Sequence, residues 1–547
     1  MSEGSTVGDL VAAFLEANGI DNAFGVISIH NMPMLDAIGR RNRVRFVAAR
    51  GEAGALNMAD AATRATGVPA AAITSTGTGA GNAAGALIEA QTAGVPLLHL
   101  TGQIETAFYG RGAGYIHEAA DQMGVLRAVS KAAFHIGSAD EAEAQLKQAL
   151  QTARTAPAGP VSIEIPIDVQ NAEASWSDDL AVEPAPPLAP DSEALDALAD
   201  ELADARRPLL WLGAGARHAG AEARKLADMG FAVITSTQGR AIVPENHPGS
   251  LGAFTVQKAV EELYATCDHM LIAGSRLRGN ETLKYKIRLP ERRTQIDVDP
   301  GAENRSYTTS RFLLADSRLV LQGLIDRLEG RFAADPAFAA DIAAAREAAE
   351  QDLRSGLGPY SALIDHLAAA AGDDFTWVRD ITISNTAWGN KLPTLTGPRN
   401  GIHAVGGGIG QGLPMAIGAA VADGGDRKIM AMVGDGGLQL CLGELATAVD
   451  ERAPLILLVM NDQGYGVIRN IQDVHYGGRH HYSSPSTPDF AMVAAGIGLP
   501  HRRVAALSEM PDAFTWAQAL DGPGMIEVDM IAVGPFARTF AGPPVRK

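Results

Sequence analysis

Cysteine is scarce in this chain of 547 residues, whose two cysteines, Cys267 and Cys441, lie far apart. A disulfide framework and a cysteine-based metal site are therefore excluded, and a reducing, cytoplasmic location is expected. Long apolar runs are also missing, since none approaches the roughly 18 to 20 residues of a membrane span. The N-terminal segment MSEGSTVGDLVAAFLEANG lacks the basic head and apolar stretch of a signal peptide. We expect no association with membranes.

Positive charge is in short supply, with 45 Lys and Arg against 63 Asp and Glu and a formal net charge of −18. Such a balance repels nucleic acid and anionic membrane surfaces, so neither is an expected partner. Hydrophobic residues make up 46% of the chain, and the mean hydropathy is +0.02. The length exceeds what one core supports, so we expect several globular domains that act on small molecules.

Apolar runs that resemble buried strands alternate with helical patterns along the whole chain. In the first part they read NAFGV, RFVAA, PAAAIT and PLLHLTG, each followed by a turn and a helix-like segment. This rhythm predicts parallel sheets covered by helices on both faces. A segment dense in proline and acidic residues, 175–193, is typical of a linker. The predicted fold is α/β with three doubly wound parallel-sheet domains, over 1–180, 190–345 and 355–547.

The strongest local signal is KIMAMVGDGGLQLCLGELATAVDERAPLILLVMNDQGYG. Its first apolar strand runs into the turn 434–436, and its second ends at Asn461 and Asp462. A strand, helix and strand crossover brings the carboxyl ends of both strands to one sheet edge. Asp435 and Asp462 are then placed to share a metal, and paired carboxylate oxygens suit Mg²⁺. The amides of Gly436 and Gly437, which open a helix, face the same edge.

This spacing is similar to the cofactor fingerprint of thiamine-diphosphate enzymes. From about residue 7 to about residue 530 the chain resembles acetolactate synthases, benzoylformate decarboxylases and benzaldehyde lyases, in the same domain order. The resemblance implies pyrimidine-binding, central and diphosphate-binding domains, with thiamine diphosphate and Mg²⁺ as cofactors. It implies Asp435, Asp462 and the carbonyl of Gly464 as metal ligands. The chain departs from the family pattern at Asp462, where most members have asparagine, but it keeps an oxygen ligand there.

Further segments carry the same resemblance. NGIHAVGGGIGQG is similar to the family's glycine-rich segment, in which Gly408 would accept from the aminopyrimidine and Ile409 would support the bent cofactor. FVAARGEAGALNMAD places Glu52 where the family has the acidic partner of the pyrimidine N1′. The residues implied to contact the cofactor are Glu52, Thr76, Asn82, Ser384, Asn385, Gly408, Ile409, Gly434, Gly436, Gly437, Tyr465 and Gly466.

The resemblance implies an enzyme that breaks or makes a carbon–carbon bond on a 2-oxo acid or related ketone, as a decarboxylase or a carboligase. It also implies a homodimer or homotetramer, with Glu52 and Asp435 of one site contributed by different subunits. Besides Glu52, the candidate catalytic residues are His30, His117 and Gln122, in loops that match the family's substrate cleft.

Three alternatives remain open at this stage. One is a catalytically silent relative, although Glu52 is retained. Another is a carbon–carbon hydrolase, and the third is an oxidase-type relative with FAD in the middle domain, where GAGARHAG and GSRLRGN form glycine-containing turns. Bound flavin is not favoured, because parallel sheets produce such turns regardless of a ligand. A true acetolactate synthase is disfavoured by Ile471, which stands where those enzymes have a tryptophan.

Overall fold

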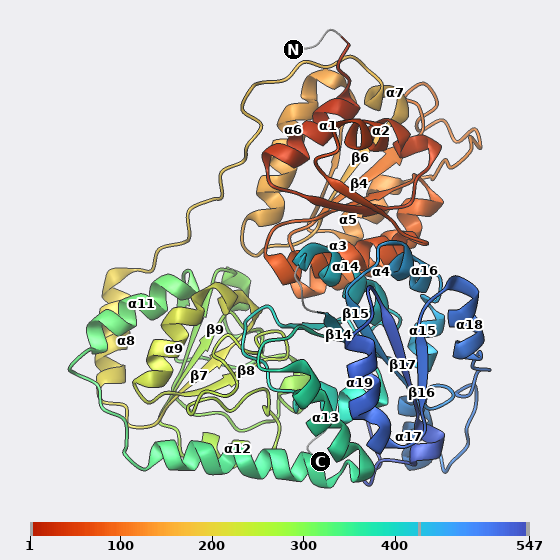
Figure 1. Ribbon diagram of the computed structural model, residues 1–547. Helices are drawn as coiled ribbons and strands as arrows, with labels where there is room; N and C mark the ends of the chain where they lie inside the picture. The colour runs from red at the N-terminus through yellow and green to blue at the C-terminus, as the bar shows by residue number, and fades with distance from the viewer. Residues whose placement is uncertain (1–3, 425–427, 543–547) are drawn as a thin grey trace.

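The chain folds into three α/β domains, each built on a parallel sheet, as the sequence predicts. The computed structural model describes residues 4–424 and 428–542. Residues 1–3 of the predicted first domain and residues 543–547 of the predicted third domain therefore lie outside the described residues. Figure 1 shows the first domain at the top, the middle domain at the lower left and the third domain at the lower right. All strand pairs within these sheets are parallel.

The first domain holds a six-stranded sheet in the order β2-β1-β3-β4-β6-β5. Its strands are β1 Asn22–Gly25, β2 Arg45–Ala48, β3 Ala71–Thr74, β4 Leu98–Gln103, β5 Ala132–His135 and β6 Val161–Pro166. Its helices are α1 Val7–Ala17, α2 Met32–Arg41, α3 Glu52–Thr66, α4 Thr78–Ala93, α5 Gln122–Val129, α6 Ala139–Arg154 and α7 Ile167–Gln170. After α7 an extended segment leads across to the middle domain (Figure 1).

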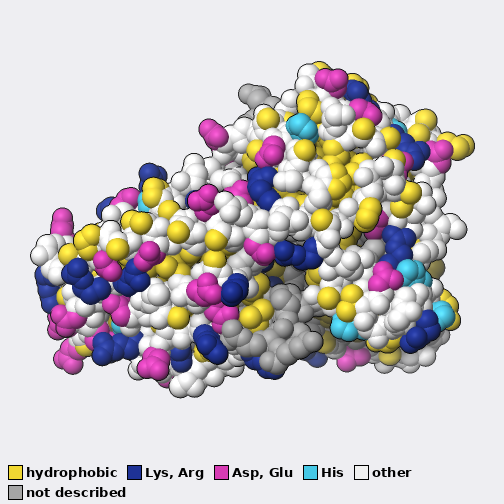
Figure 2. All heavy atoms as spheres, turned by 90° about the horizontal axis from the view of Figure 1, so that it is seen from below, with side chains coloured by type: hydrophobic (Ala, Val, Ile, Leu, Met, Phe, Trp, Pro, Cys, Tyr) yellow, Lys and Arg dark blue, Asp and Glu magenta, His cyan; other side chains and the backbone are white. Residues whose placement is uncertain are grey.

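The middle domain holds a five-stranded sheet in the order β11-β10-β9-β7-β8. Its strands are β7 Pro208–Leu212, β8 Ala232–Thr235, β9 His269–Ala273, β10 Arg293–Asp297 and β11 Arg311–Leu314. Its helices are α8 Ser192–Ala203, α9 Gly220–Asp228, α10 Lys258–Tyr264 and α11 Ser317–Leu328. Helix α12, Phe338–Ser355, runs unbroken across the predicted boundary and along the bottom of the molecule (Figure 1). Figure 2 shows acidic and basic side chains intermixed over this face of the middle domain.

The third domain holds a six-stranded sheet in the order β13-β12-β14-β15-β17-β16. Its strands are β12 Trp377–Arg379, β13 Gly401–His403, β14 Ile429–Gly434, β15 Leu455–Asn461, β16 His501–Val504 and β17 Gly524–Asp529. Its helices are α13 Ser361–Ala371, α14 Gly412–Asp423, α15 Asp435–Gln439, α16 Glu444–Asp450, α17 Gly466–His475, α18 Phe490–Ile497, α19 Met510–Gln518 and α20 Met530–Val533, with a π-helical turn at Asn385–Gly389.

Helices α3 and α14 join the first domain to the third. Both are rich in alanine and glycine and are buried along most of their length. The small side chains let the two backbones approach closely: a Cβ on Gly418 would lie 2.1 Å from the carbonyl oxygen of Met58. One continuous apolar core therefore contains α3, α4 and α14 and spans both domains. Among the described residues, no helix combines the length and apolar character that a bilayer crossing needs.

Two buried histidines make the folded state sensitive to acid. Burial lowers the pKa of His99 and of His403 to about 3, and the His99 ring is held between the hydroxyls of Thr74 and Ser162, each at 2.9 Å. The folded pKa lies below the unfolded value, so stability is present above pH 6.5 and falls as pH decreases toward 3. Each histidine should contribute a slope of about 1.4 kcal/mol per pH unit.

We therefore expect His99→Gln to flatten the fall in urea-unfolding free energy between pH 7 and pH 5. The exposed His481 offers a matched control, because His481→Gln should leave that slope unchanged. An unaltered slope in His99→Gln would show that His99 takes up its proton in the folded protein as readily as in the unfolded chain.

Candidate active site

The acidic pair predicted from the sequence lies at the carboxyl edge of the third sheet. Strands β14 and β15 are parallel neighbours with Gly434 opposite Met460. Asp435 follows the first strand directly as the first residue of α15, and Asp462 follows the second strand after Asn461. The crossover through α15 and α16 thus brings both carboxylates to one place.

The Asp435 carboxylate is completely buried and organises the turn after β15. Its Oδ1 accepts from the backbone N–H of Asp462 at 3.3 Å, and its Oδ2 accepts from the N–H of Gly464 at 2.8 Å. The hydroxyl of Thr487 also donates to Oδ2, at 2.9 Å. Asp435 therefore holds the turn that carries Asp462 and the Gly464 carbonyl.

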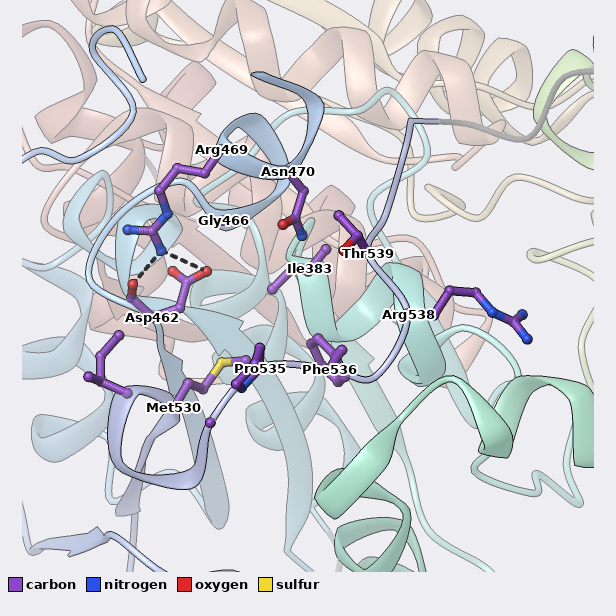
Figure 3. Close-up of a pocket in the computed structure, with 12 residues that line it drawn as sticks. Ile383, Asp462, Gly466, Arg469, Asn470, Met530, Pro535, Phe536, Arg538 and Thr539 are labelled. Atoms are coloured by element: carbon purple, nitrogen blue, oxygen red, sulfur yellow. Dashed lines mark hydrogen bonds and ion pairs between the residues drawn. The ribbon is translucent and has the colours of Figure 1, made fainter. Parts of the chain in front are cut away.

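Asp462 lies beside Asp435 in a partly enclosed hollow. Burial, and then the charge of Asp435, raise the pKa of Asp462 to about 7, while Arg469 opposes this shift. Figure 3 shows the Arg469 guanidinium directed at Asp462, with a distance of 3.2 Å from Nη2 to Oδ2. The same carboxylate lies against the start of α17, since a Cβ on Gly466 would be 1.7 Å from Oδ2. Only glycine at position 466 leaves room for the carboxylate.

This donor set fits a hard divalent cation that takes few ligands from the protein. In residues 4–424 and 428–542, no group of three or more His, Cys, Asp and Glu side chains could hold a metal by itself. Mg²⁺ needs no such group, because it is commonly held by one or two carboxylates together with phosphate oxygens and water. Asp435, Asp462 and the carbonyl of Gly464 supply oxygens of this kind.

A buried carboxylate that the sequence did not single out, Asp380, connects the glycine-rich segment to this edge. Its Oδ2 accepts from the N–H of Gly410 at 2.9 Å, and a Cβ on Gly437 would lie 2.8 Å from the same oxygen. Burial raises the pKa of Asp380 to about 6, against the effect of its backbone hydrogen bonds. In the segment it holds, Gly408 is exposed and Ile409 is partly exposed. Ile409 is therefore available to a ligand, unlike a core residue.

The remaining predicted contacts of the third domain surround the same edge. Tyr465 lies over the turn, because a Cβ on Gly436 would be 2.7 Å from its ring. Ser384 and Asn385 are both buried where the π-helical turn begins, and the Asn385 Oδ1 has no hydrogen-bond partner among the described residues. Ser384 donates to the sulfur of Met530, at 3.9 Å. Of the predicted residues of this domain, Asp462 and Gly466 line a pocket of about 280 Å³ (Figure 3).

Glu52 is the first residue of α3 in the first domain, where an extended Gly51 caps the helix. Its Oε2 accepts from the Asn82 side chain at 3.2 Å, and a Cβ on Gly79 would lie 3.0 Å from its Oε1. Two predicted cofactor contacts, Glu52 and Asn82, are therefore neighbours. Both belong to the first domain.

The N-terminus of α3 is also held by the third domain, through a residue that sequence reasoning missed. The buried Glu444 on α16 accepts from the N–H of Arg50 at 3.1 Å and from the hydroxyl of Thr447 at 2.7 Å. A Cβ on Gly54 would lie 2.2 Å from the Glu444 Oε1. No local sequence pattern predicts this contact, which links positions 394 residues apart.

His30 and His117 meet in the first domain, as candidate substrate-side residues should. Their rings are in edge contact with centroids 5.2 Å apart. His30 is buried, and within the described part of the chain its Nδ1 has no partner, whereas His117 is exposed and has a positive φ of 66°. Burial, followed by the neighbouring His117, lowers the pKa of His30. His30 therefore offers a neutral, unsatisfied ring nitrogen.

Gln122, also predicted as catalytic, is engaged within the protein. Its Oε1 accepts from the Thr76 hydroxyl at 2.9 Å and from the Gly77 N–H at 2.6 Å. Its Nε2 donates to the Gly102 carbonyl at 3.0 Å and to the buried carboxylate of Glu164 at 2.6 Å. These contacts hold Gln122 against the loop around Thr76.

Of the two glycine-containing turns of the middle domain, one is closely packed and the other lines a pocket. Gly213 packs against the second turn, since its Cβ would lie 2.1 Å from the Gly274 carbonyl oxygen, so close packing explains this glycine. The second turn contributes Arg276 and Arg278 to a pocket of about 440 Å³ that Arg305 also lines. Burial, and then the other two arginines, lower the pKa of Arg276. This pocket is suited to an anion.

Paired carboxylates at a strand crossover, beside an exposed glycine segment and a hollow lined largely by apolar side chains, define the class of protein: a three-domain α/β protein with an acidic site at the carboxyl edge of its third sheet. Comparison with family models identifies the family. The chain matches three models of thiamine pyrophosphate enzymes, namely the N-terminal TPP binding domain over 5–125, the central domain over 195–324 and the C-terminal TPP binding domain over 383–528. The chain belongs to the thiamine pyrophosphate enzyme family, whose cofactor is also called thiamine diphosphate.

Curated relatives extend over nearly the whole chain. A probable 2-ketoarginine decarboxylase of Pseudomonas aeruginosa is 30% identical over 518 residues, covering 92% of this chain and 90% of the relative. The large subunit of acetolactate synthase isozyme 1 of Escherichia coli is 28% identical, covering 90% and 88%. A probable chloroplastic acetolactate synthase 2 of Oryza sativa is also 28% identical, covering 95% and 82%.

Proposed function

We propose that this protein is a thiamine-diphosphate and Mg²⁺ dependent enzyme that cleaves or forms a carbon–carbon bond next to the carbonyl of a 2-oxo acid. The observation that carries the proposal is the convergence of Asp435 and Asp462 at the β14–β15 edge, within a chain that matches all three family models. The names of the relatives, a decarboxylase and acetolactate synthases, support this reaction class.

In the third domain, Asp435, Asp462 and the Gly464 carbonyl would hold the metal. The glycines at 434, 436 and 437 would let a diphosphate approach the backbone, with Ser384, Asn385, Tyr465 and Gly466 around it. When bound, the cofactor supplies a thiazolium carbon that adds to the substrate carbonyl and takes up the electron pair of the broken bond. The protein residues bind and orient it.

Glu52 would hold and exchange the proton at N1′ of the aminopyrimidine, with Asn82 fixing its carboxylate. The Gly408 carbonyl would accept from the exocyclic amine, and Ile409 would support the bent ring arrangement. His30 and His117 would contact the substrate, with the neutral His30 able to accept a proton. Gln122 and Thr76 would position this wall of the cleft.

The test is reconstitution. Protein stripped of ligands should bind thiamine diphosphate only in the presence of Mg²⁺, measured by calorimetry, and should then release CO₂ from members of a 2-oxo acid panel. The panel should contain pyruvate, benzoylformate and 2-ketoarginine, with aldehyde and 2-hydroxy ketone products separated by chromatography. Failure to bind the cofactor in any condition would overturn the proposal. Binding without turnover on any 2-oxo acid would favour a silent relative, and hydrolysis of a diketone would favour a hydrolase.

The proposal includes a homodimer or homotetramer in which Glu52 and Asp435 of one site come from different subunits. Co-expressing two inactive chains, Glu52→Gln and Asp435→Ala, should restore about a quarter of the active sites, because each mixed dimer contains one intact site. Activity of the purified mixture measures this. If both residues of a site belong to one chain, the mixture will stay inactive.

Two further elements belong to the proposal. A cytoplasmic location is supported by cysteines that are both free.

An anionic cofactor such as FAD in the middle domain is a second candidate, favoured by the pocket that Arg276, Arg278 and Arg305 line. A flavin absorption band in the purified protein would support it, and a colourless protein would remove it.

A further inference from the structure

Arg469 is the cation that faces the predicted metal ligands, and its contacts are mainly with backbone. It lies on α17, three residues into the helix. Its Nη1 donates to the Gln463 carbonyl at 3.0 Å, and its Nη2 donates to the Asp462 carbonyl. The contact with the Asp462 carboxylate is longer, at 3.2 Å. Figure 3 shows both interactions with Asp462 in the hollow.

The positive charge of Arg469 is held in place whether or not the Asp462 carboxylate pairs with it. Because two main-chain carbonyls hold the guanidinium, it keeps its place if the Asp462 side chain turns toward a metal. An arginine remains charged under all physiological conditions. When both are ionised, the buried Asp435 and the partly exposed Asp462 carry two negative charges side by side, and close like charges repel strongly where water is excluded. Arg469 reduces that net charge by one.

We propose that Arg469 is a positioning residue of the cofactor site, which clamps the Asp462–Gly464 turn and offsets the charge of Asp462 so that a metal-bound diphosphate is accepted there. This inference rests on the proposed function. It assigns to Arg469 a role toward the anionic part of the cofactor: a bound Mg²⁺ would only neutralise the two carboxylates, and the guanidinium adds one further positive charge that faces a diphosphate. The need for Arg469 should therefore depend on the charge at position 462.

The experiment is a double-mutant cycle on the full-length protein, with the dissociation constant of thiamine diphosphate at saturating Mg²⁺ measured by calorimetry. Arg469→Met should weaken binding about tenfold, the effect of losing a charged hydrogen-bonding partner. In an Asp462→Asn background the same change should weaken binding about twofold at most, because the charge to be offset is gone. The Arg538→Met variant is the matched control. Arg538 lines the same pocket but pairs with Asp352 at 3.0 Å, so binding should change less than twofold.

The outcomes distinguish a failure of the proposed function from a failure of the role of Arg469. If the unaltered protein binds no thiamine diphosphate, the proposed function fails. If it binds and Arg469→Met binds equally well, the role of Arg469 fails. An equal loss in both backgrounds would also overturn it, since it would leave a clamp on the turn without charge compensation. Should Arg469→Met not fold, Arg469→Gln keeps a donor for the Gln463 carbonyl without the charge and is expected to show the same dependence on position 462.

Discussion

Glu52→Gln is expected to slow the exchange of the C2 proton of bound thiamine diphosphate by about 10²- to 10⁴-fold, the usual contribution of a positioned acid or base. Glutamine has the same shape as glutamate, so the α3 helix and the contact with Asn82 should survive. Cofactor affinity should therefore change little, which separates a proton-transfer defect from a binding defect. Proton exchange followed by NMR after acid quenching measures the first, and calorimetry measures the second.

A matched control for Glu52→Gln is Glu16→Gln on α1, which removes a carboxylate that pairs with Arg41 at 2.6 Å. Its exchange rate should equal that of the unaltered protein. Near-normal exchange in Glu52→Gln would exclude Glu52 as the proton partner of N1′. Loss of cofactor binding in that variant would instead point to a binding role.

The second large effect is expected at Gly466. A Cβ there would lie 1.7 Å from the Asp462 Oδ2, so Gly466→Ala must displace either the carboxylate or the start of α17. We expect the affinity for thiamine diphosphate with Mg²⁺ to fall by about 10- to 100-fold, because one metal ligand and its supporting turn are misplaced. Equilibrium dialysis against labelled cofactor measures this loss.

Gly496→Ala on α18 supplies the control for Gly466→Ala, since a Cβ on Gly496 meets no atom within 4 Å. That change should leave cofactor affinity unaltered. In an Asp462→Ala background, Gly466→Ala should add little, because the obstructing carboxylate is absent. Retained affinity in the single variant Gly466→Ala would show that the observed position of Asp462 is not the one that binds the metal.

Much of the fold was predictable because its signals are local. Buried strands such as β3 and β14 are continuous apolar runs, and each ends at a glycine or acidic turn that the sequence displays directly. The closeness of Asp435 and Asp462 followed from the crossover rule for parallel strands, which needs only the order of the elements. The resemblance to the family added Glu52 and Ile409, whose chemistry no local pattern specifies.

Other features of the site were not predictable, because they depend on contacts between distant segments. In the sequence Asp380 is an ordinary residue after a short strand, yet its carboxylate accepts a hydrogen bond from the N–H of Gly410. Glu444 holds Arg50 from another domain. The hydrogen bonds at both ends of the Gln122 amide likewise depend on segments that the sequence does not bring together.

The sequence by itself determined the α/β class, the order of the three parallel sheets and the acidic pair, because periodicity and strand order are properties of the chain alone. Only the tertiary structure decided the charge balance at Asp462, the close fit of Gly466 and the contact of Glu444 with α3. Each of these depends on distances and burial, which arise when segments remote in sequence pack together and exclude water from the groups between them.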